Sequence, residues 1–281
     1  MALEVVVYII LIAYINTKMK KAFNKVYTKA IVQLATQQSF LLSIYFKHLW
    51  KPKSNSLEAY IDNFALETTK EKKTFCFLQI GANNGYQHDP IFKLLQRYPH
   101  WQGILIEPQK AIFDTQLSVM YRQYKNLQLL NAAIATVNGF MPIYKIAFSN
   151  ERWASGLTSF DRSTLERHID NGYIDQCAQK QGIRPPTHRA DYITTEQVTC
   201  VTFDTVITQY KVKNLDLLMI DTEGFDFEII KMINFAQLKP RLIVFEHIHL
   251  SATDFDACQK LLQSNGYQLQ NLGRDTAALC V

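Results

Sequence analysis

Short apolar runs of strand length alternate with helix-like segments along most of the chain from residue 74 onward. The runs with strand-like composition or alternation are FCFLQI, GILIE, LQLLNAAIA, FMPIYKIAF, QVTCVTF, LDLLMI, RLIVFEHI, YQLQNL and TAALCV. Strands that alternate with helices at this spacing predict a doubly wound, mostly parallel sheet. The last two runs have no helix between them, which predicts one antiparallel strand at that edge.

Helix signals support the same pattern. Asp89 followed by Pro90 is a typical helix start, because Asp caps free N–H groups and Pro fits the first turn. A further helix is expected from Gln109 to about Tyr124, and others lie near 204–210, 227–232 and 255–266.

The first 56 residues differ in pattern and predict a basic, helical N-terminal extension before a main domain at 57–281. Residues 17–50 contain neither Gly nor Pro, and LWKPKSNS has the composition of a linker. The apolar run from Val5 to Ile15 is shorter than the ~20 residues of a membrane-spanning helix. Three interpretations stay open: residues 1–30 lie against an anionic membrane surface, the extension packs on the domain, or the start codon is placed too far upstream.

Composition and charge narrow the classes of partner. The chain has 281 residues, 48% of them hydrophobic, which is enough for a sizeable core. Its formal net charge is +5, but residues 1–53 hold eight lysines and a single acid, so the remainder is slightly acidic. A nucleic-acid partner is therefore not expected. The five cysteines are dispersed without a CxxC pair, which is typical of reduced thiols in a cytoplasmic protein, with peripheral membrane association still open.

The turn after the first strand has the features of a nucleotide-binding loop. In a doubly wound sheet ligands bind at the carboxyl ends of the strands, where this chain has Gln79, Gly81, Asn83 and Gly85. Glycines let the backbone turn sharply and approach a ligand. The spacing is G-x-x-x-G and not the G-x-G-x-x-G of dinucleotide sites, which disfavours a pyrophosphate-containing cofactor.

Two polar residues at the ends of the next strands extend this predicted cofactor site. Glu107 ends the second strand, 26 residues after Gly81, where an acid accepts hydrogen bonds from ribose hydroxyls. The alternative is a surface acid that favours the start of the following helix. Asn131, at the end of the third strand, is placed to reach an adenine edge, although a strand-terminal Asn is also a common turn residue.

Six segments occur in the order IGANNG, ILIEP, NAAIA, VTFDTVI, LLMIDTEGFDFEII and LIVFEH, and this series resembles the FkbM family of S-adenosylmethionine-dependent methyltransferases. The resemblance spans about Phe75 to Val281. It implies a class I, Rossmann-like fold with a seven-stranded sheet and S-adenosyl-L-methionine as the cofactor. It also implies methyl transfer to a hydroxyl of a sugar or glycan, a glycolipid or a secondary metabolite. The sequence departs from the class at Gln79, where an acid is often found.

The candidate catalytic residues follow the strands LDLLMI and RLIVFEHI. Asp221 and Glu223 come after the first strand, and Glu246 and His247 end the second. A hydroxyl is a poor nucleophile, so a general base with a tuned pKa is useful, and two neighbouring acids raise one another's pKa. The alternatives are that Asp221 only positions the methionine part of the cofactor and that Glu223 only caps the next helix.

The residues around these acids have plainer expected roles. Asp226 and Glu228 are first-turn acids that complement a helix dipole. His247 and His249 alternate with Ile248 and are expected to share a face. We favour an acid-and-histidine acceptor site over a histidine pair that binds a metal, and therefore expect no metal.

Residues 149–195 contain no predicted strand and interrupt the alternation, so we expect an insertion that covers the acceptor side of the sheet. Trp153 is suited to stack on a sugar ring, and Arg162 is suited to meet an anionic group. With His249 they are the predicted substrate-binding residues. Other polar residues of the insertion are as typical of a solvated surface as of a binding site: Arg167, His168 and Arg189.

Two other functions remain compatible with the sequence. An NAD-dependent oxidoreductase would share the fold, but the missing middle glycine disfavours it. The second is a non-catalytic cofactor-binding scaffold that residues 1–30 attach to a membrane.

Overall fold

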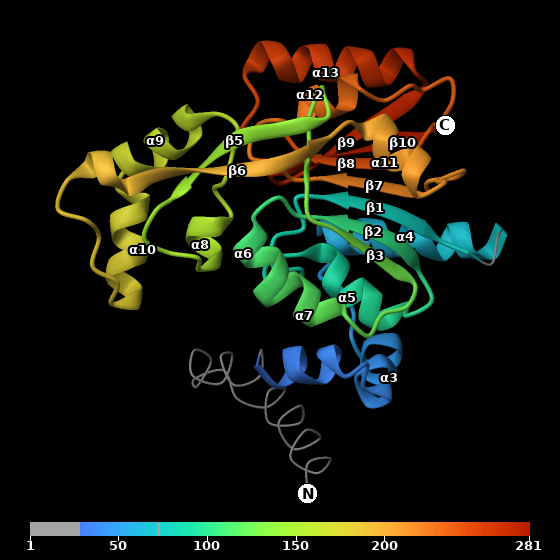
Figure 1. The fold of residues 1–281 in the computed structure, drawn as a ribbon. Coiled ribbons are helices and arrows are strands. Elements are labelled where there is room, and N and C mark those ends of the chain that lie inside the picture. The colour runs from blue at the N-terminus through green and yellow to red at the C-terminus, as the bar shows by residue number, and fades with distance from the viewer. Residues whose placement is uncertain (1–28, 72–73) are drawn as a thin grey trace, which may run out of the picture.

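The computed structural model describes residues 29–71 and 74–281, and its centre is a sheet of seven strands (Figure 1). Across the sheet the strands follow the order β3-β2-β1-β7-β8-β10-β9. Their bounds are β1 Cys76–Ile80, β2 Gln102–Ile106, β3 Leu127–Leu130, β7 Leu217–Ile220, β8 Leu242–Glu246, β9 Tyr267–Leu272 and β10 Asp275–Cys280. Neighbouring strands are parallel except that β10 runs antiparallel to β8 and β9. The predicted mostly parallel, Rossmann-like sheet is confirmed, with its antiparallel strand one position in from the edge.

The order of the strands reverses at β1, which has β2 on one side and β7 on the other. In a doubly wound sheet the crevice at such a switch point is where ligands bind. The carboxyl ends of β1, β2 and β7 therefore define the place to look for a site.

Helices cover both faces of the sheet (Figure 1). One face carries α4 (Leu57–Glu71), α5 (Pro90–Arg97), α6 (Lys110–Ile112) and α7 (Ser118–Tyr121), and the other carries α11 (Phe203–Gln209), α12 (Asp226–Lys231) and α13 (Ala252–Ser264). A π-helical turn at Phe113–Leu117 joins α6 to α7, so the helix predicted at 109–124 is present but not uniform. Side chains from successive strand positions point into a hydrophobic core on one face of the sheet or on the other. Burial of each large apolar side chain stabilises the fold by about 1.5–3 kcal/mol.

The start of α5 follows the predicted signal. Asp89 is the N-cap, and its Oδ1 accepts a hydrogen bond from the N–H of Ile91 at 2.7 Å, with Pro90 in the first turn. The side chains of Ile91, Leu94 and Leu95 are fully buried against the sheet. The cap therefore starts a helix whose apolar face is buried.

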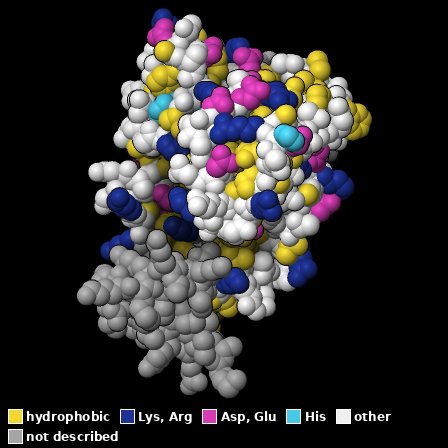
Figure 2. All heavy atoms as spheres, turned by 90° about the vertical axis from the view of Figure 1, so that its left-hand side faces the viewer, with side chains coloured by type: hydrophobic (Ala, Val, Ile, Leu, Met, Phe, Trp, Pro, Cys, Tyr) yellow, Lys and Arg dark blue, Asp and Glu magenta, His cyan; other side chains and the backbone are white. Residues whose placement is uncertain are grey.

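A second, small sheet lies beside the first and carries the insertion. It contains β4 (Ala133–Ile134), β6 (Ile193–Val201) and β5 (Gly139–Ile146), in that order. The run LQLLNAAIA is thus two strands in two sheets, and the strand predicted from QVTCVTF begins earlier, inside the predicted insertion. Three α-helices follow β5, α8 (Arg152–Ser155), α9 (Arg162–Asp170) and α10 (Tyr173–Gln181), and a 3-10 helix at Arg189–Tyr192 precedes β6. Figure 2 shows this end of the molecule, where acidic and basic side chains are interspersed.

The described part of the N-terminal extension packs on the domain. Residues 29–36 are helical, and α3 (Phe40–His48) follows them. Leu42 and Phe46 of α3 are buried in the same hydrophobic core as Leu94 and Trp101. No helix within the described ranges is long and apolar enough to cross a membrane. The run from Val5 to Ile15 lies outside those ranges.

Candidate active site

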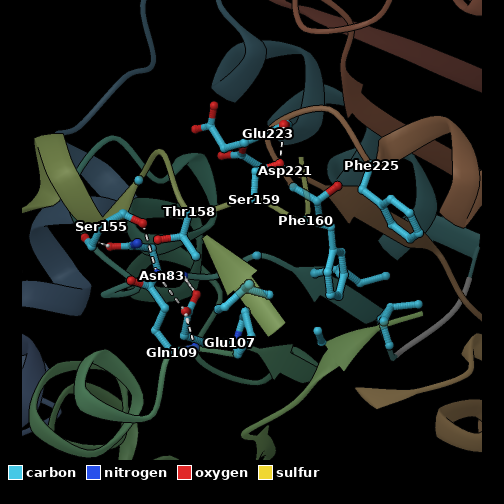
Figure 3. A pocket seen from close by; sticks show the side chains of 18 of the residues that line it. Asn83, Glu107, Gln109, Ser155, Thr158, Ser159, Phe160, Asp221, Glu223 and Phe225 are labelled. Atoms are coloured by element: carbon cyan, nitrogen blue, oxygen red, sulfur yellow. Dashed lines mark hydrogen bonds between the residues drawn. The ribbon is translucent and has the colours of Figure 1, made fainter. Parts of the chain in front are cut away.

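A pocket opens at the carboxyl ends of β1, β2 and β7, and the segment 152–160 of the insertion forms its opposite wall (Figure 3). We call it the inner pocket. Its lining residues are Ile80, Gly81, Asn83, Glu107, Pro108, Gln109, Ala132, Ala133, Ile134, Ile143, Arg152, Ser155, Gly156, Thr158, Ser159, Phe160, Asp221, Thr222, Glu223 and Phe225. The structure thus brings together four residues predicted to bind the cofactor: Gly81, Asn83, Glu107 and Asp221.

Glu107 is held at the end of β2 by hydrogen-bond donors. It is only 2% exposed. Its Oε2 accepts from the N–H of Asn83 at 2.8 Å, and its Oε1 accepts from the N–H and the side-chain amide of Gln109 at 2.9 and 3.1 Å. A carboxylate offers about four lone-pair sites, so one remains for a ligand hydroxyl. Burial raises the pKa of Glu107 to about 7 despite these hydrogen bonds, which lower it.

Gly81 brings the loop after β1 against the loop after β7. Its φ is 83°, and a Cβ atom there would lie 1.8 Å from the carbonyl oxygen of Asp221. The N–H groups of Gly81 and Ala82 both donate to the carbonyl of Ile106 in β2, at 3.0 and 2.9 Å. The glycine is therefore required by contact between two backbone segments, which places Asp221 beside the β1 loop.

The insertion is hydrogen-bonded to the opposite side of the inner pocket. Ser155 donates to Oδ1 of Asn83 at 3.2 Å and accepts from the Gln109 side chain, through its carbonyl, at 2.9 Å. Ser159 donates to the carbonyl of Glu223 at 3.0 Å. Asn83 has a φ of 46°, in the left-handed region that Asn tolerates better than most residues. The segment SGLTSF is thus part of the pocket itself.

Two residues predicted to bind the cofactor lie outside the inner pocket. Gln79 is buried in β1, and its side-chain amide donates to Oδ2 of Asp89 at 3.0 Å, at the start of α5. Gly85 lies against the helix beyond the pocket: a Cβ atom there would meet Tyr121 at 2.5 Å and Leu117 at 2.7 Å. Both residues support the β1 loop from behind.

Asn131 also lies outside the inner pocket. Its side-chain amide donates to the carbonyls of Glu107 and Pro108, at 2.8 and 3.0 Å. The next residues in the chain, Ala132 and Ala133, line the pocket instead. Asn131 therefore joins the end of β3 to the end of β2 and does not face the space where an adenine edge was predicted to lie.

A second cavity adjoins the inner pocket, and we call it the outer cavity. Its lining residues are Leu57, Glu58, Gln87, His88, Pro90, Glu151, Arg152, Trp153, Gly156, Leu157, His168, Tyr173, Gln181, Met219, Asp221, Glu223, Glu246, Arg274 and Asp275. Arg152, Gly156, Asp221 and Glu223 line both spaces. These four residues form a shared wall, and three of them have ionisable side chains.

A tight turn after β7 directs Glu223 to the shared wall. Glu223 has a φ of 53° and Gly224 a φ of 108°, and a non-glycine residue in this region stores strain. Asp226 was expected to be an ordinary first-turn acid, but it is fully buried. Its Oδ2 accepts from the N–H and the hydroxyl of Thr222 at 3.2 and 2.7 Å, and its Oδ1 accepts from the N–H of Glu246 at 3.1 Å. Asp226 thus joins the turn to the end of β8.

Glu223, Glu246 and His249 converge at the outer cavity. His249 Nε2 lies 3.0 Å from Oε2 of Glu223 and 3.2 Å from Oε2 of Glu246. The other carboxylate oxygen of Glu246, Oε1, lies 2.8 Å from Nη2 of Arg274. Two predicted catalytic acids and one predicted substrate-binding histidine therefore meet in space. The sequence places Glu246 and His249 near each other, but not Glu223, which follows another strand.

The acids of this region are crowded. Burial raises the pKa of Asp221 well above its ordinary value, and the charges of Glu223 and Asp226 raise it further. Burial and the charges of Asp221 and Glu223 raise the pKa of Glu246 to about 9. Burial also raises the pKa of Asp275 to about 6. The shared wall and its surroundings therefore carry an excess of carboxyl groups over cationic side chains.

His247 points away from this cluster. Its ring stacks on Phe255 with the centroids 4.9 Å apart, and its Nδ1 lies 3.0 Å from the hydroxyl of Thr276. The chain leaves the extended conformation after Glu246 and turns. The predicted shared face of His247 and His249 is therefore wrong, because alternation holds only while a strand continues.

The insertion contributes some of its predicted residues and not others. Trp153 lines the outer cavity and donates its indole N–H to Gln181 at 3.0 Å. Arg162 lies outside both cavities, where it pairs with Glu166 at 2.7 Å. His168 lines the outer cavity with a buried Nδ1 that has no hydrogen-bond partner in the described part of the chain, and burial lowers its pKa.

Several lining residues had no signal in the sequence. Gln109 orients Glu107, while Thr158 and Phe160 add to the inner pocket and Arg274 to the outer cavity. Thr158 and Phe160 lie in the insertion 149–195, for which only a cover over the acceptor side of the sheet was expected. Arg274 lies in a turn between two late strands, and nothing in its sequence neighbourhood indicates a binding role.

The chain matches one family of known proteins and is similar to several solved structures. A family model described as the methyltransferase FkbM domain matches residues 79–269. No curated protein matches the chain. Among solved structures, the chain is similar to a precorrin-6y C5,15-methyltransferase from Geobacter metallireducens, with 11% identity, 83% of this chain and 94% of that chain covered, and a TM-score of 0.38. It is also similar to CalS11, a TDP-rhamnose 3'-O-methyltransferase of calicheamicin biosynthesis, with 10% identity, 90% and 92% covered, and a TM-score of 0.35.

The family match includes the β1 loop, Glu107, the SGLTSF segment, the turn at Glu223 and the end of β8. It spans more than half of the 281 residues. The chain therefore belongs to the FkbM methyltransferase family.

Proposed function

We propose that the protein is an S-adenosyl-L-methionine-dependent O-methyltransferase. The observation that carries this proposal is the shared wall, because Asp221 and Glu223 line both the inner pocket and the outer cavity. In Figure 3, Glu107 lies across the inner pocket from these two acids. A nucleoside held at Glu107 would therefore extend toward the wall beyond which an acceptor binds.

The inner pocket has the chemistry of a sulfonium nucleoside site. Glu107 retains a lone pair for a ribose hydroxyl, and Phe160 with neighbouring apolar residues offers surface for an adenine ring: Ala132, Ala133 and Ile134. Asp221 supplies negative charge for a cationic ligand. Among the described lining residues Arg152 is the only Lys or Arg, which disfavours a pyrophosphate and hence an NAD-type cofactor.

The residues of the chain then have distinct tasks. When bound, S-adenosyl-L-methionine supplies an electrophilic methyl group. Glu107 and Asn83 orient the nucleoside, and the wall formed by 155–160 keeps water from the inner pocket. Asp221, on the shared wall, receives the proton that the acceptor hydroxyl loses, while Glu223 and Glu246 orient that hydroxyl. Alignment of the reacting groups can supply several kcal/mol, on the order of 7–11 in the best cases.

The acceptor we propose is a hydroxyl of a sugar or glycan, a glycolipid or a secondary metabolite. Acidic side chains dominate the charged lining of the outer cavity: Glu58, Glu151, Asp221, Glu223, Glu246 and Asp275, against Arg152 and Arg274. Carboxylates accept hydrogen bonds from hydroxyl groups and repel anionic acceptors. Trp153 supplies an aromatic surface of the kind on which sugar rings stack. We further propose that 149–195 acts as the acceptor-side cover of a domain at 57–281.

A titration separates the proposed function from its alternatives. S-adenosylhomocysteine and NAD are each titrated into the protein by calorimetry, and we expect saturable binding of the first and none of the second. At a concentration about 100 times its Kd, S-adenosylhomocysteine should stabilise the protein by about 2.7 kcal/mol. Binding of NAD alone would refute the proposal. Transfer of labelled methyl groups to hydroxylated sugars, with the matched deoxy sugars as controls, then tests the acceptor class.

A further inference from the structure

We infer that Glu223, Glu246 and His249 form a binding site for a divalent transition-metal ion at the outer cavity. From the sequence, His247 and His249 were the conceivable metal-binding pair, and an acid-and-histidine acceptor site without metal was favoured over it. In the structure His247 points away, and the side chain that lies beside His249 is Glu223, which comes from a different loop. One ligand atom from each of the three residues lies within 4.8 Å of the other two.

Two of the three distances between these atoms match the edges of a coordination sphere, and the third is at most 4.8 Å. Metal–nitrogen and metal–oxygen bonds of about 2.0–2.2 Å separate neighbouring ligand atoms by roughly 2.9–3.5 Å in octahedral or tetrahedral geometry. The observed separations from His249 Nε2 are 3.0 Å to Glu223 and 3.2 Å to Glu246. His249 therefore already lies at coordination distance from each glutamate oxygen, and the two glutamates lie close enough to share an ion with it.

The three atoms are also buried and unpaired by hydrogen bonds. Glu246 is 6% exposed and Glu223 9% exposed. Within the described residues, Oε2 of each glutamate and Nε2 of His249 have no hydrogen-bond partner. Burying a polar atom without a hydrogen-bond partner is unfavourable, so convergent atoms of this kind indicate a missing ligand.

An imidazolium ion between two carboxylates is the alternative explanation. A single N–H bond of His249 can point at one oxygen, yet two oxygens lie almost equally close and neither forms a hydrogen bond with it. The surrounding acids Asp221 and Asp226 add further negative charge. A divalent ion accepts a lone pair from each of the three atoms and offsets this charge, which one proton does not do.

The backbone holds the ligands in place independently of any ion. The left-handed conformation of Glu223 orients its carboxylate, and Asp226 joins the Glu223 turn to the N–H of Glu246. His249 follows three residues later in a turn. Two separate strand ends are thus fastened together at the point where the ligand atoms meet.

The ligand set indicates the class of ion and its task. Two carboxylates with one imidazole suit Mn²⁺, Fe²⁺, Co²⁺ or Zn²⁺ better than Ca²⁺, which prefers oxygen ligands alone. Three protein ligands leave coordination positions open, as in catalytic sites. If the proposed function holds, on which this role rests, the acceptor hydroxyl occupies an open position and becomes easier to deprotonate.

The test is a titration with MnCl₂. The full chain is treated with a chelator, freed of it, and titrated while electron paramagnetic resonance follows the signal of free aqueous Mn²⁺. We expect saturable binding of a single Mn²⁺ per chain. Glu246→Gln and His249→Gln, which preserve side-chain size, should each weaken binding by at least about tenfold. Glu228→Gln, at a half-buried acid of α12 that pairs with Lys231 at 2.7 Å, should leave binding unchanged.

S-adenosylhomocysteine binding is measured on the same samples, because neither Glu246 nor His249 lines the inner pocket. Retained binding in both variants shows that they are folded, and one folded variant is enough for the test. Absence of Mn²⁺ binding in the wild type, or equal binding in the variants, would overturn the metal site alone. If the wild type binds Mn²⁺ but no S-adenosylhomocysteine, the circular dichroism of the variants is compared with that of the wild type. Loss of Mn²⁺ binding in a variant with an unchanged spectrum would then support the metal site and refute the proposed cofactor.

Discussion

Glu107 and Glu246 are both buried glutamates at the carboxyl end of a strand, but their neighbours differ. Glu107 accepts three hydrogen bonds from N–H groups, which favour its charged form. Glu246 lies among other acids, with Arg274 on one oxygen and His249 on the other. A carboxylate among N–H donors is suited to accept further hydrogen bonds, whereas one among acids is suited to meet a cation.

Cofactor affinity should depend on the ionisation of Glu107. Burial raises the pKa of the unliganded group to about 7, while hydroxyl donors of a ligand favour the carboxylate. Affinity for S-adenosylhomocysteine should therefore rise as the pH rises through 7 and level off above it. From about pH 6 to about pH 8 we expect about a tenfold gain by calorimetry.

Two variants test whether the ionisation of Glu107 causes this pH dependence. Glu107→Gln cannot ionise at this position, so the gain should disappear, and affinity at high pH should fall by about 1.5–3 kcal/mol. Glu67→Gln, at an exposed acid of α4, should keep the wild-type profile. A persistent gain in Glu107→Gln would show that a different group controls binding.

At the scale of elements, the site depends on how closely the loops after β1 and β7 approach. Gly81 leaves no room for a side chain against the carbonyl of Asp221, and Asp226 fastens the β7 loop to β8. Three strand ends are thereby held in contact around the shared wall. A change that separates these loops should affect both cavities at once.

A comparison of two glycines tests the loop contact. Gly81 and Gly273 both have positive φ, 83° and 74°, but a Cβ at Gly273 would meet nothing within 4 Å. Gly273→Ala should cost only the backbone strain, about 1–2 kcal/mol. Gly81→Ala should cost at least about 1–3 kcal/mol more, because a backbone segment must move, and should weaken S-adenosylhomocysteine binding. Denaturant unfolding measures both, and equal costs would contradict the contact.

At the scale of the molecule, the described part of the N-terminal extension belongs to the core. Phe46 of α3 is 2% exposed and has Trp50 at a ring distance of 5.5 Å, within the hydrophobic core that also contains Leu94 of α5. The predicted boundary near residue 56 therefore separates segments of different composition that share one hydrophobic core.

Two phenylalanines of α3 test this packing. Phe46→Ala should lower the free energy of unfolding by about 3–5 kcal/mol, because it removes a buried ring and leaves a cavity. Phe40→Ala in the same helix, at a ring that is 76% exposed, should change it by less than about 0.5 kcal/mol. Urea unfolding provides the comparison. Similar small effects in both variants would show that the extension contributes little to the core.

Much of the fold was predictable because it rests on local pattern. Apolar runs of strand length, the cap at Asp89 and the missing helix before the last strand act over a few residues, and each was confirmed. The position of Glu107 at the inner pocket was predictable for the same reason, since strand ends in such a sheet meet at one edge, while its binding role stays a prediction. Gln79 and Gly85 were assigned by position alone, and the structure gives them contacts with α5 and with Tyr121.

The sequence by itself determined the order of strands and helices, the family pattern and the strand ends at which the chemistry lies, because periodicity and turn signals are local properties. Only the tertiary structure decided which side chains meet. His247 turns to Phe255, while His249 turns to Glu223 from another loop. That choice depends on the turn after β8 and on the buried Asp226 between two loops. Contacts between residues distant in the chain arise from packing, and the spacing of residues along the sequence does not predict them.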